Sequence, residues 1–360
     1  MSTTSPLPPG VPPQTPPPPR EAKGVAFYVA IFLGLLLVVS AGLNVLLLLF
    51  SASALLGSGG MAGGENLDEV HVAGPSGAHV RVLQIPVHGA ISQAQNPLLG
   101  AKGGMVGRIE QQLKSAADDE SIRGILLDID SPGGGVTDSD EIHSAILRFK
   151  KEHPRVRVVA LFGDMAASGG YYVAAAAERI VARPTTITGS IGVIMSGYNF
   201  AEAAKKLGVE GVTIKSERTP FKDILSPMRP MRDDERALLT GIVDELFDRF
   251  VDVVDQGRPD LTREQVLAVA TGAIYTARQA VQNGLVDEIG DRESVLRWFE
   301  RELGGDVALV ELRQRPGLFD LLTNPGLGSR ADGGGLDAAA RELMTELSGP
   351  RFLYFWQGGR

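Results

Sequence analysis

Ser168 is the residue of this chain whose surroundings most favour chemistry. It lies in the segment GDMAASGG, residues 163–170, directly after the apolar run 156–162, which has the composition of a buried strand. A serine at a strand-to-helix turn can act as a nucleophile when a base takes its proton, and N–H groups at the start of the helix can stabilise an oxyanion. Gly169 and Gly170 would let a substrate backbone approach. The alternative is that Ser168 only caps the helix.

A base for Ser168 that comes from the downstream chain must be a lysine. All five histidines precede Ser168, and only four lysines follow it. Lys222 stands among apolar residues in PFKDILSP, and an apolar environment disfavours the charged form of a lysine. Lys215, after a short apolar run, is a weaker candidate. Taken alone, either residue could be an ordinary surface lysine.

Two further turns offer polar groups at the ends of expected strands. In SPGGG, residues 131–135, the N–H groups of Gly133 and Gly134 could hold a tetrahedral oxygen. A phosphate loop is the rival interpretation, but the segment has neither Gly-Lys-Ser/Thr nor G-x-G-x-x-G, and a plain tight turn remains open. Ser190, in TGSIGV, could orient the lysine by a hydrogen bond or could be a simple turn serine.

The composition limits the class of protein. The chain is 44% hydrophobic and 22% charged, as folded proteins are, and its net charge of −8 without a basic stripe argues against a nucleic-acid partner. The absence of cysteine excludes disulfides, Cys-ligated zinc and a cysteine nucleophile. Serine and lysine chemistry requires no metal and no cofactor, and we expect neither.

The N-terminal region predicts a membrane anchor. Residues 1–23 form a Pro-rich tail, and residues 24–50 contain a 26-residue uncharged stretch that is long enough to cross a bilayer as a helix. Arg20 and Lys23 precede this stretch, so the positive-inside rule places the tail in the cytoplasm and the rest of the chain outside. A cleaved signal peptide is the alternative, because Ala-Ser-Ala at 52–54 resembles a cleavage site, but the apolar stretch is longer than such peptides have.

The remaining chain alternates expected strands and helices. A flexible linker at 51–79 leads to a domain at 80–300, in which strands at 80–87, 124–129, 156–162, 179–182 and 187–195 alternate with helices at 105–117, 138–151, 171–177 and 233–254. This alternation predicts an α/β fold with parallel pairing, and Gly-rich turns at the strand ends are where such folds bind ligands. Residues 301–360 form a C-terminal extension with a Gly-rich loop at 324–335, a helix at 338–347 and an aromatic end.

Five segments together resemble the signal peptide peptidase A family of bacterial membrane-anchored serine proteases, peptidase family S49, in its short single-domain form. They are SPGGGV (131–136), GDMAASGGYYVAAAA (163–177), TGSIGV (188–193), FKDILSPMRPM (221–231) and YTARQAVQNGLVDEIG (275–290). The resemblance covers roughly residues 80–295 and the anchor.

The resemblance implies a Ser/Lys dyad in which Ser168 is the nucleophile, Lys222 the general base and Ser190 the residue that orients the lysine. The oxyanion donors would be the N–H groups of Gly169 and of Gly133 or Gly134. It also implies a ClpP/crotonase-like α/β fold of repeated ββα units behind one N-terminal transmembrane helix, and a homo-oligomer in which serine and lysine come from neighbouring protomers.

By the same resemblance, the protein would be a serine endopeptidase of the bacterial inner (cytoplasmic) membrane. Its domain would lie on the extracytoplasmic face and cleave apolar peptides such as signal-peptide remnants. Two other functions remain open. A crotonase-type acyl-CoA enzyme would share the fold class but would need an adenine-nucleotide loop, and a catalytically silent scaffold would bind partners through the aromatic end and leave Lys222 inert. A ClpP-like Ser-His-Asp protease is disfavoured, because its histidine follows the serine.

Overall fold

The computed structural model describes residues 25–58, 67–92, 104–314 and 352–355. The chain divides into two units, Met1–Glu65 and Asn66–Arg360, and each is described by itself. The described part of the first unit is helix α1 (Val25–Ser58). Within it, Val29–Leu46 has a mean hydropathy of 2.5 and exposed side chains, so this helix is long and apolar enough to cross a membrane. The expected anchor is therefore a helix, and it continues past residue 50.

Strands and helices alternate in the second unit, as expected. The strands are β1 (Leu67–Ala73), β2 (Val80–His88), β3 (Ile122–Ser131), β4 (Gly133–Gly135), β5 (Arg157–Ala167), β6 (Arg179–Ala182), β7 (Ile187–Gly189), β8 (Ile194–Met195), β9 (Ile274–Thr276), β10 (Glu288–Ile289), β11 (Val307–Gln314) and β12 (Phe352–Phe355). The helices are α2 (Gly104–Ala117), α3 (Val136–Glu152), α4 (Gly169–Ala174), α5 (Ala201–Lys206), α6 (Asp233–Gly257), α7 (Arg263–Val269), α8 (Ala277–Gln282) and α9 (Arg292–Leu303). The loop expected at 324–335 and the helix expected at 338–347 lie outside the described residues.

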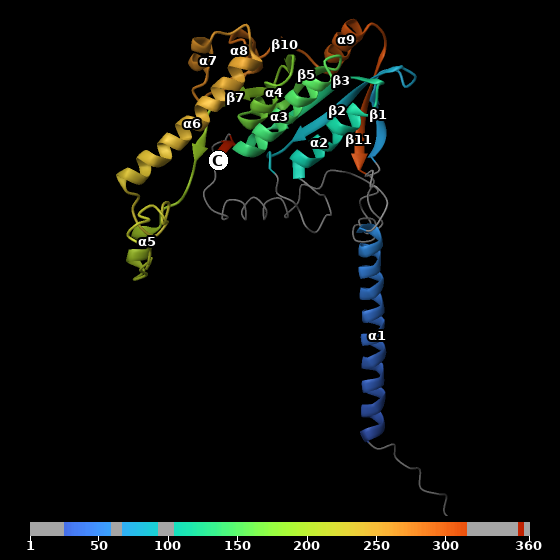
Figure 1. Cartoon of the computed structure of the whole chain (residues 1–360), viewed down its shortest axis with the longest axis vertical. Coiled ribbons are helices and arrows are strands. Elements are labelled where there is room, and N and C mark those ends of the chain that lie inside the picture. The colour runs from blue at the N-terminus through green and yellow to red at the C-terminus, as the bar shows by residue number, and fades with distance from the viewer. Residues whose placement is uncertain (1–24, 59–66, 93–103, 315–351, 356–360) are drawn as a thin grey trace, which may run out of the picture. The chain divides into compact units, whose positions relative to one another are not determined.

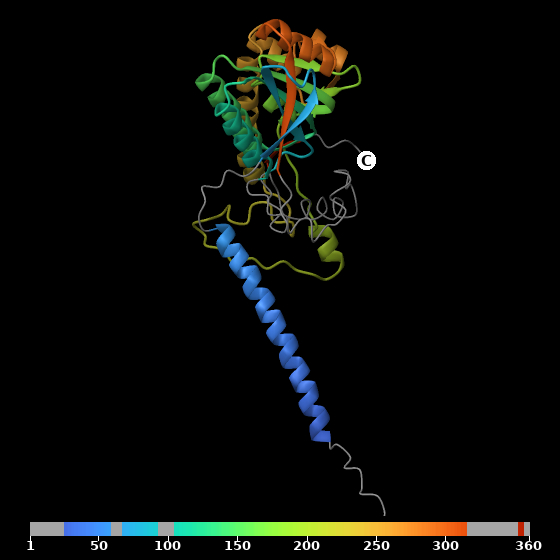
Figure 2. The ribbon, with the colours of Figure 1, turned by 90° about the vertical axis from the view of Figure 1, so that its right-hand side faces the viewer.

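One large sheet organises this unit (Figures 1 and 2). Its strand order is β1-β11-β2-β3-β5-β6-β10, with β7 beside β5 and β9 beside β7. Every neighbouring pair from β11 to β10 is parallel, whereas β1 runs antiparallel to β11. Parallel neighbours need crossover connections, and helices supply several of them. The expected α/β fold with parallel pairing is confirmed.

The central strands are apolar because helices cover both faces of the sheet. Leu83 and Leu127 point to the face on which α2, α3 and α4 pack, and both are fully buried. Leu126 points to the opposite face, where it joins Val295 and Phe299 of α9 in a second cluster. Strands buried on both sides read as continuous hydrophobic runs, which is why the sequence identifies them.

The large sheet includes two strands that lie outside the range 80–300 expected for the domain. Strand β1 lies inside the expected linker 51–79, and β11 lies inside the expected extension 301–360. β11 pairs with β2 from Val307↔Val80 onward, and β1 pairs with β11 over Leu67–Ala73. The sheet extends beyond the expected domain because backbone groups at the free edge of β2 need partners.

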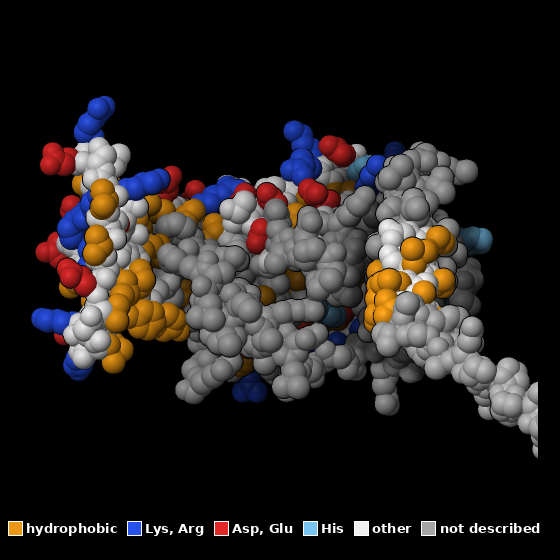
Figure 3. Space-filling model, turned by 90° about the horizontal axis from the view of Figure 1, so that it is seen from below, with side chains coloured by type: hydrophobic (Ala, Val, Ile, Leu, Met, Phe, Trp, Pro, Cys, Tyr) orange, Lys and Arg blue, Asp and Glu red, His pale blue; other side chains and the backbone are white. Residues whose placement is uncertain are grey.

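Residues 196–232, between β8 and α6, form a segment that we call the arm. It contains α5, which Figure 1 shows beyond the lower end of α6 and away from the sheet. The amide of Phe200, near the start of the arm, donates to the carbonyl of Pro227, near its end, at 2.7 Å. This hydrogen bond joins the two ends of the arm. Its apolar side chains are exposed: Leu207 by 80% and Ile214 by 95%. Figure 3 shows apolar side chains gathered at this end of the molecule.

Candidate active site

Ser168 stands at the junction of β5 and α4, where the sequence predicts a strand-to-helix turn. It is the N-cap residue of α4, with φ 53° and ψ −116°, and its side chain makes no capping hydrogen bond. The residue is only 1% exposed. A non-glycine residue at positive φ costs about 1–3 kcal/mol, and such residues cluster at functional sites. The structure therefore disfavours the alternative that Ser168 is only a cap.

The glycine turn after β3 packs directly against Ser168. A Cβ built on Gly169 would lie 3.1 Å from the amide nitrogen of Gly134 and 3.2 Å from the Cα of Gly133. A Cβ on Gly134 would lie 2.0 Å from the carbonyl oxygen of Ile91, so any residue other than glycine at position 134 would clash with the backbone of Ile91. The two backbone segments expected to hold an oxyanion thus meet beside the serine.

The N–H groups of these glycines are not equivalent. The amide of Gly133 donates to the hydroxyl of Ser131 at 3.0 Å, so it already has an acceptor. Gly169 is the first residue of α4, and the first N–H groups of a helix have no partner within the helix. Among the expected donors, Gly169 is therefore better placed than Gly133 to stabilise a developing negative charge, and Gly134 lies opposite Tyr354 in the pairing of β4 with β12.

Ser190 lies next to Ser168 because their strands are paired. β5 and β7 are parallel neighbours with Ala167 opposite Gly189, and each serine directly follows its paired residue. The amide of Ser168 donates to the carbonyl of Gly189 at 2.8 Å. Ser190 also has a positive φ, 51°, and its turn separates β7 from β8, which the sequence predicted as one strand. The structure thus brings the two serines together.

Lys222 lies on the arm, and its side chain is exposed. Among the described residues, no hydrogen bond or ion pair joins its amine to Ser168 or Ser190. Lys215, the other candidate base, is engaged: its amine forms an ion pair with Asp223 and donates to the carbonyl of Pro220 at 2.8 Å. The chain therefore presents Lys222 outward and keeps Lys215 paired.

The histidine nearest to the helix of Ser168 is not poised as a base. His143 of α3 contacts the ring of Tyr172 on α4 at a centroid distance of 5.3 Å. Burial lowers the pKa of His143 to about 4, and the residue is only 3% exposed. In the part of the chain that the structure describes, no three His, Asp or Glu side chains gather in a group that could hold a metal ion.

A strand from the C-terminal region lies along the glycine turn. β12 pairs antiparallel with β4, with Tyr354 opposite Gly134, and on its other side with β8, with Leu353 opposite Ile194. These three strands form a small second sheet. The backbone edges of β4 and β8 therefore can hold an extended segment next to Ser168.

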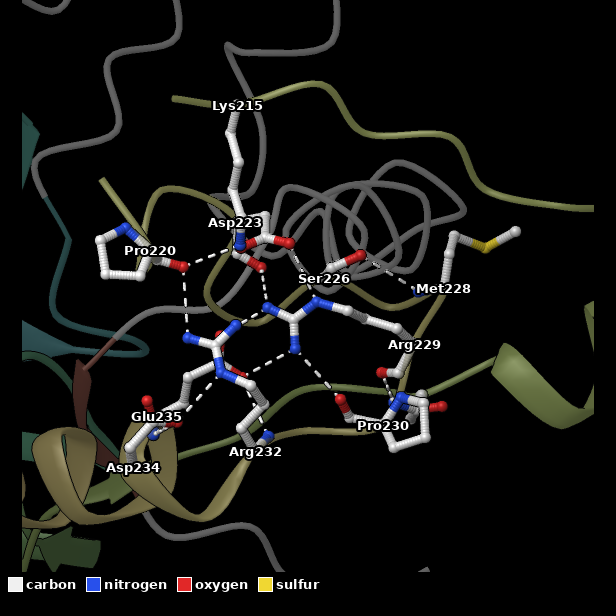
Figure 4. A network of polar contacts seen from close by, with 11 residues as sticks. Lys215, Pro220, Asp223, Ser226, Met228, Arg229, Pro230, Arg232, Asp234 and Glu235 are labelled. Carbon is white, nitrogen blue, oxygen red and sulfur yellow. Dashed lines mark hydrogen bonds and ion pairs between the residues drawn. The ribbon is translucent and has the colours of Figure 1, made fainter. Parts of the chain in front are cut away.

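Sequence reasoning missed a polar network on the arm. Arg229 contacts both Asp223 and Glu235 around the turn that carries Lys222; Lys215 also contacts Asp223, and Arg232 also contacts Glu235 (Figure 4). The signal was present as opposite charges spaced along residues 215–235, but nothing in the linear order shows which charges pair.

Models of two protein families match parts of this chain. The family model of peptidase family S49 matches residues 150–305, and that of Clp protease matches residues 101–188. A putative signal peptide peptidase SppA of Enterococcus faecium is 41% identical over 191 residues, which are 53% of this chain and 54% of that protein. A putative protease of Synechocystis is 42% identical over 188 residues, covering 52% of this chain and 66% of that one. A putative protease of Methanocaldococcus jannaschii is 37% identical over 213 residues, covering 58% and 67%.

The chain thus spans between about half and two thirds of the length of these relatives. The Clp protease match and the parallel sheet confirm the ClpP/crotonase-like α/β fold. Among the residues that the structure describes, α1 is the one helix that is long and apolar enough to cross a membrane. Ser168, Ser190 and Lys222 all lie within the matched region 150–305.

Proposed function

Because this chain belongs to peptidase family S49, in the signal peptide peptidase A group, we propose that it is a membrane-anchored serine endopeptidase. The observation that carries the proposal is the placement of Ser168. Its hydroxyl is held in a strained strand-to-helix turn, beside the start of α4 and the backbone of Gly134. This is the geometry that acyl transfer needs: a nucleophile next to N–H groups that can receive an oxyanion.

In the proposed reaction, Lys222 is the general base. Its neutral amine takes the proton of the Ser168 hydroxyl while the serine oxygen bonds to the carbonyl carbon of the substrate. The N–H groups of Gly169 and Gly134 hold the oxyanion. When the C–N bond breaks, the lysine ammonium returns the proton to the leaving amine, and a water activated in the same way hydrolyses the acyl ester. Ser190 orients the lysine amine.

Two observations support Lys222 over the other candidate bases. The amine of Lys215 is engaged by the carboxylate of Asp223 and the carbonyl of Pro220, so it is not free to contact a serine hydroxyl. No histidine follows Ser168 in the sequence. Since Lys222 is exposed on the arm, we propose that it reaches the Ser168 of a neighbouring copy in a homo-oligomer, so that each site is shared by two chains.

The proposed substrates are extended, apolar peptides, such as the remnants of signal peptides. The pairing of β12 with β4 and β8 supports this class, because it shows that these edges accept a strand, and peptide recognition by strand addition uses the same backbone hydrogen bonds. The charges flanking the apolar stretch support a cytoplasmic N-terminus, with the catalytic unit on the extracytoplasmic face of the bacterial cytoplasmic membrane.

Turnover of an apolar fluorogenic peptide by the full chain in detergent, beside its Lys222→Ala variant, tests the proposal. We expect the variant to lose roughly 10³-fold or more in kcat/KM at unchanged oligomeric size. The wild-type rate should rise with pH as the base loses its proton. Full activity in Lys222→Ala, or a rate that peaks in acid and falls through neutrality, would show that the base is another group.

A further inference from the structure

The residue that follows Lys222 is an aspartate, and the arm holds its carboxylate away from the lysine. One oxygen of Asp223 contacts the amine of Lys215, and the other accepts from Nε of Arg229 at 2.9 Å. Arg229 also donates to the backbone carbonyl of Asp223 at 2.9 Å. The side chain of Asp223 is only 12% exposed. Both carboxylate oxygens are thus directed at cations other than Lys222.

Arg229 is itself fixed from the other side. Its Nη1 donates to Glu235 at 2.8 Å, and Glu235 is fully buried at the start of α6. Glu235 also accepts from the amide of Arg232 at 3.0 Å, which ties the carboxylate to the helix N-terminus. Figure 4 shows the guanidinium of Arg229 between the two carboxylates. The arginine therefore has little freedom to release Asp223.

The same network fixes the backbone before Lys222. The carbonyl of Pro220 accepts from the amine of Lys215 at 2.8 Å and from Arg232 at 3.2 Å. The amide of Lys222 donates to the carbonyl of Thr219 at 3.1 Å. The turn is held on both sides of Lys222, while the lysine side chain points outward.

We propose that Arg229, helped by Lys215, is a positioning residue that sequesters the Asp223 carboxylate and so keeps the amine of Lys222 free of an anionic neighbour. This inference rests on the proposed function of Lys222 as the base. An anion beside an ammonium stabilises the charged form, and a general base must be neutral to work. Hydrogen bonds from Arg229 and then from Lys215 also hold the pKa of Asp223 well below its usual range, so this carboxylate stays charged.

Other charged groups lie on the segments around Lys222. Asp234 and Glu235 at the start of α6 pair with Arg232 and Arg229. Lys222's own turn carries one carboxylate and one guanidinium, and α6 begins with one more carboxylate; these are Glu217, Arg218 and Asp233.

The test is the pH profile of kcat/KM for Arg229→Gln in the full chain. The freed carboxylate should move the alkaline-rising limb to higher pH by about one unit, which lowers the rate at neutral pH about tenfold. The double variant Asp223→Asn with Arg229→Gln should bring the limb back toward its wild-type position, because no carboxylate remains. A role in folding alone would lower the rate without moving the limb, and the second substitution would not restore it.

Control variants separate the effect of Asp223 from other effects of the substitutions. Arg232→Gln removes an arginine of the same network that does not contact Asp223. The rising limb of the pH profile of kcat/KM for this variant should therefore coincide with that of the wild type. If Arg229→Gln does not assemble, Lys215→Met removes the other cation and should move the limb in the same direction. An unmoved limb in the assembled Arg229→Gln variant, with Lys222→Ala inactive, overturns this inference and leaves the base assignment standing; an active Lys222→Ala overturns the base assignment itself.

Discussion

Ser168 keeps a backbone conformation that side chains rarely adopt, at φ 53° and ψ −116°. Glycine enters this region without steric cost, whereas any Cβ is strained there. Both Ser168→Ala and Ser168→Gly should abolish hydrolysis, because both remove the hydroxyl. We expect the glycine variant to be the more stable of the two, by about 1 kcal/mol in the free energy of unfolding, since it releases the strain.

Urea unfolding of the two variants measures this difference. Ser144 is the matched control, because it lies inside helix α3, where glycine is less stable than alanine by about 1 kcal/mol. The order of stability should therefore reverse between the two positions. Equal stability of the two Ser168 variants would mean that this turn stores no strain, and residual hydrolysis by either would remove Ser168 as the nucleophile.

The glycines of strand β4 bring a backbone segment against the turn that carries Ser168. A Cβ on Gly134 would lie 2.0 Å from the carbonyl oxygen of Ile91, closer than real contacts allow. Gly134→Ala should push the turn away from Gly169 and lower kcat by about 10²-fold or more, the usual effect of losing an oxyanion donor. It should also lower the melting temperature.

Gly305→Ala is the control for that variant, because a Cβ on Gly305 meets no atom within 4 Å. It should leave both kcat and the melting temperature close to wild type. If Gly134→Ala kept full activity, the glycine turn would be only a structural turn, as the alternative interpretation of SPGGG has it.

Some strands of the sheet can be predicted from the sequence alone, and others cannot. The buried strands β3 and β5 are recognisable because both of their faces are covered and their residues are uniformly apolar. Strand β1 was missed because its residues are only partly buried and its partner β11 lies at the other end of the unit's sequence. The proximity of Ser168 and Ser190 followed only from a resemblance, since it depends on β5 pairing with β7, which local patterns do not encode.

The sequence predicts less about the arm. PFKDILSP suggests an apolar environment for Lys222, yet the structure leaves this lysine exposed. Hydrophobic neighbours in the sequence do not bury a side chain unless another surface covers them, and on the arm Phe221 is itself 37% exposed. What would cover this surface is a property of an assembly and cannot be derived from one chain's residue order.

In the molecule as a whole, the two residues that we propose as nucleophile and base differ in exposure: Ser168 is buried at the end of β5, and Lys222 is exposed on the arm. The arm also exposes large apolar side chains, including Val212 and Ile214. On a soluble domain, an exposed apolar surface of this kind marks a site of interaction with another molecule. If a second copy covers the arm, each site combines the serine of one copy with the lysine of another. Two variants that are each inactive would then restore activity when they assemble together.

Co-expression of Ser168→Ala and Lys222→Ala, each with a different affinity tag, tests for this restored activity. Each variant alone should be inactive. In mixed oligomers that are purified over both tags, a site is restored when an intact serine meets an intact lysine from its neighbour, which random assembly gives for about a quarter of the sites of a ring. We therefore expect about a quarter of the wild-type activity. Mixed oligomers without activity would place the serine and its base in one chain, and the arm would then have to fold back onto its own sheet during catalysis.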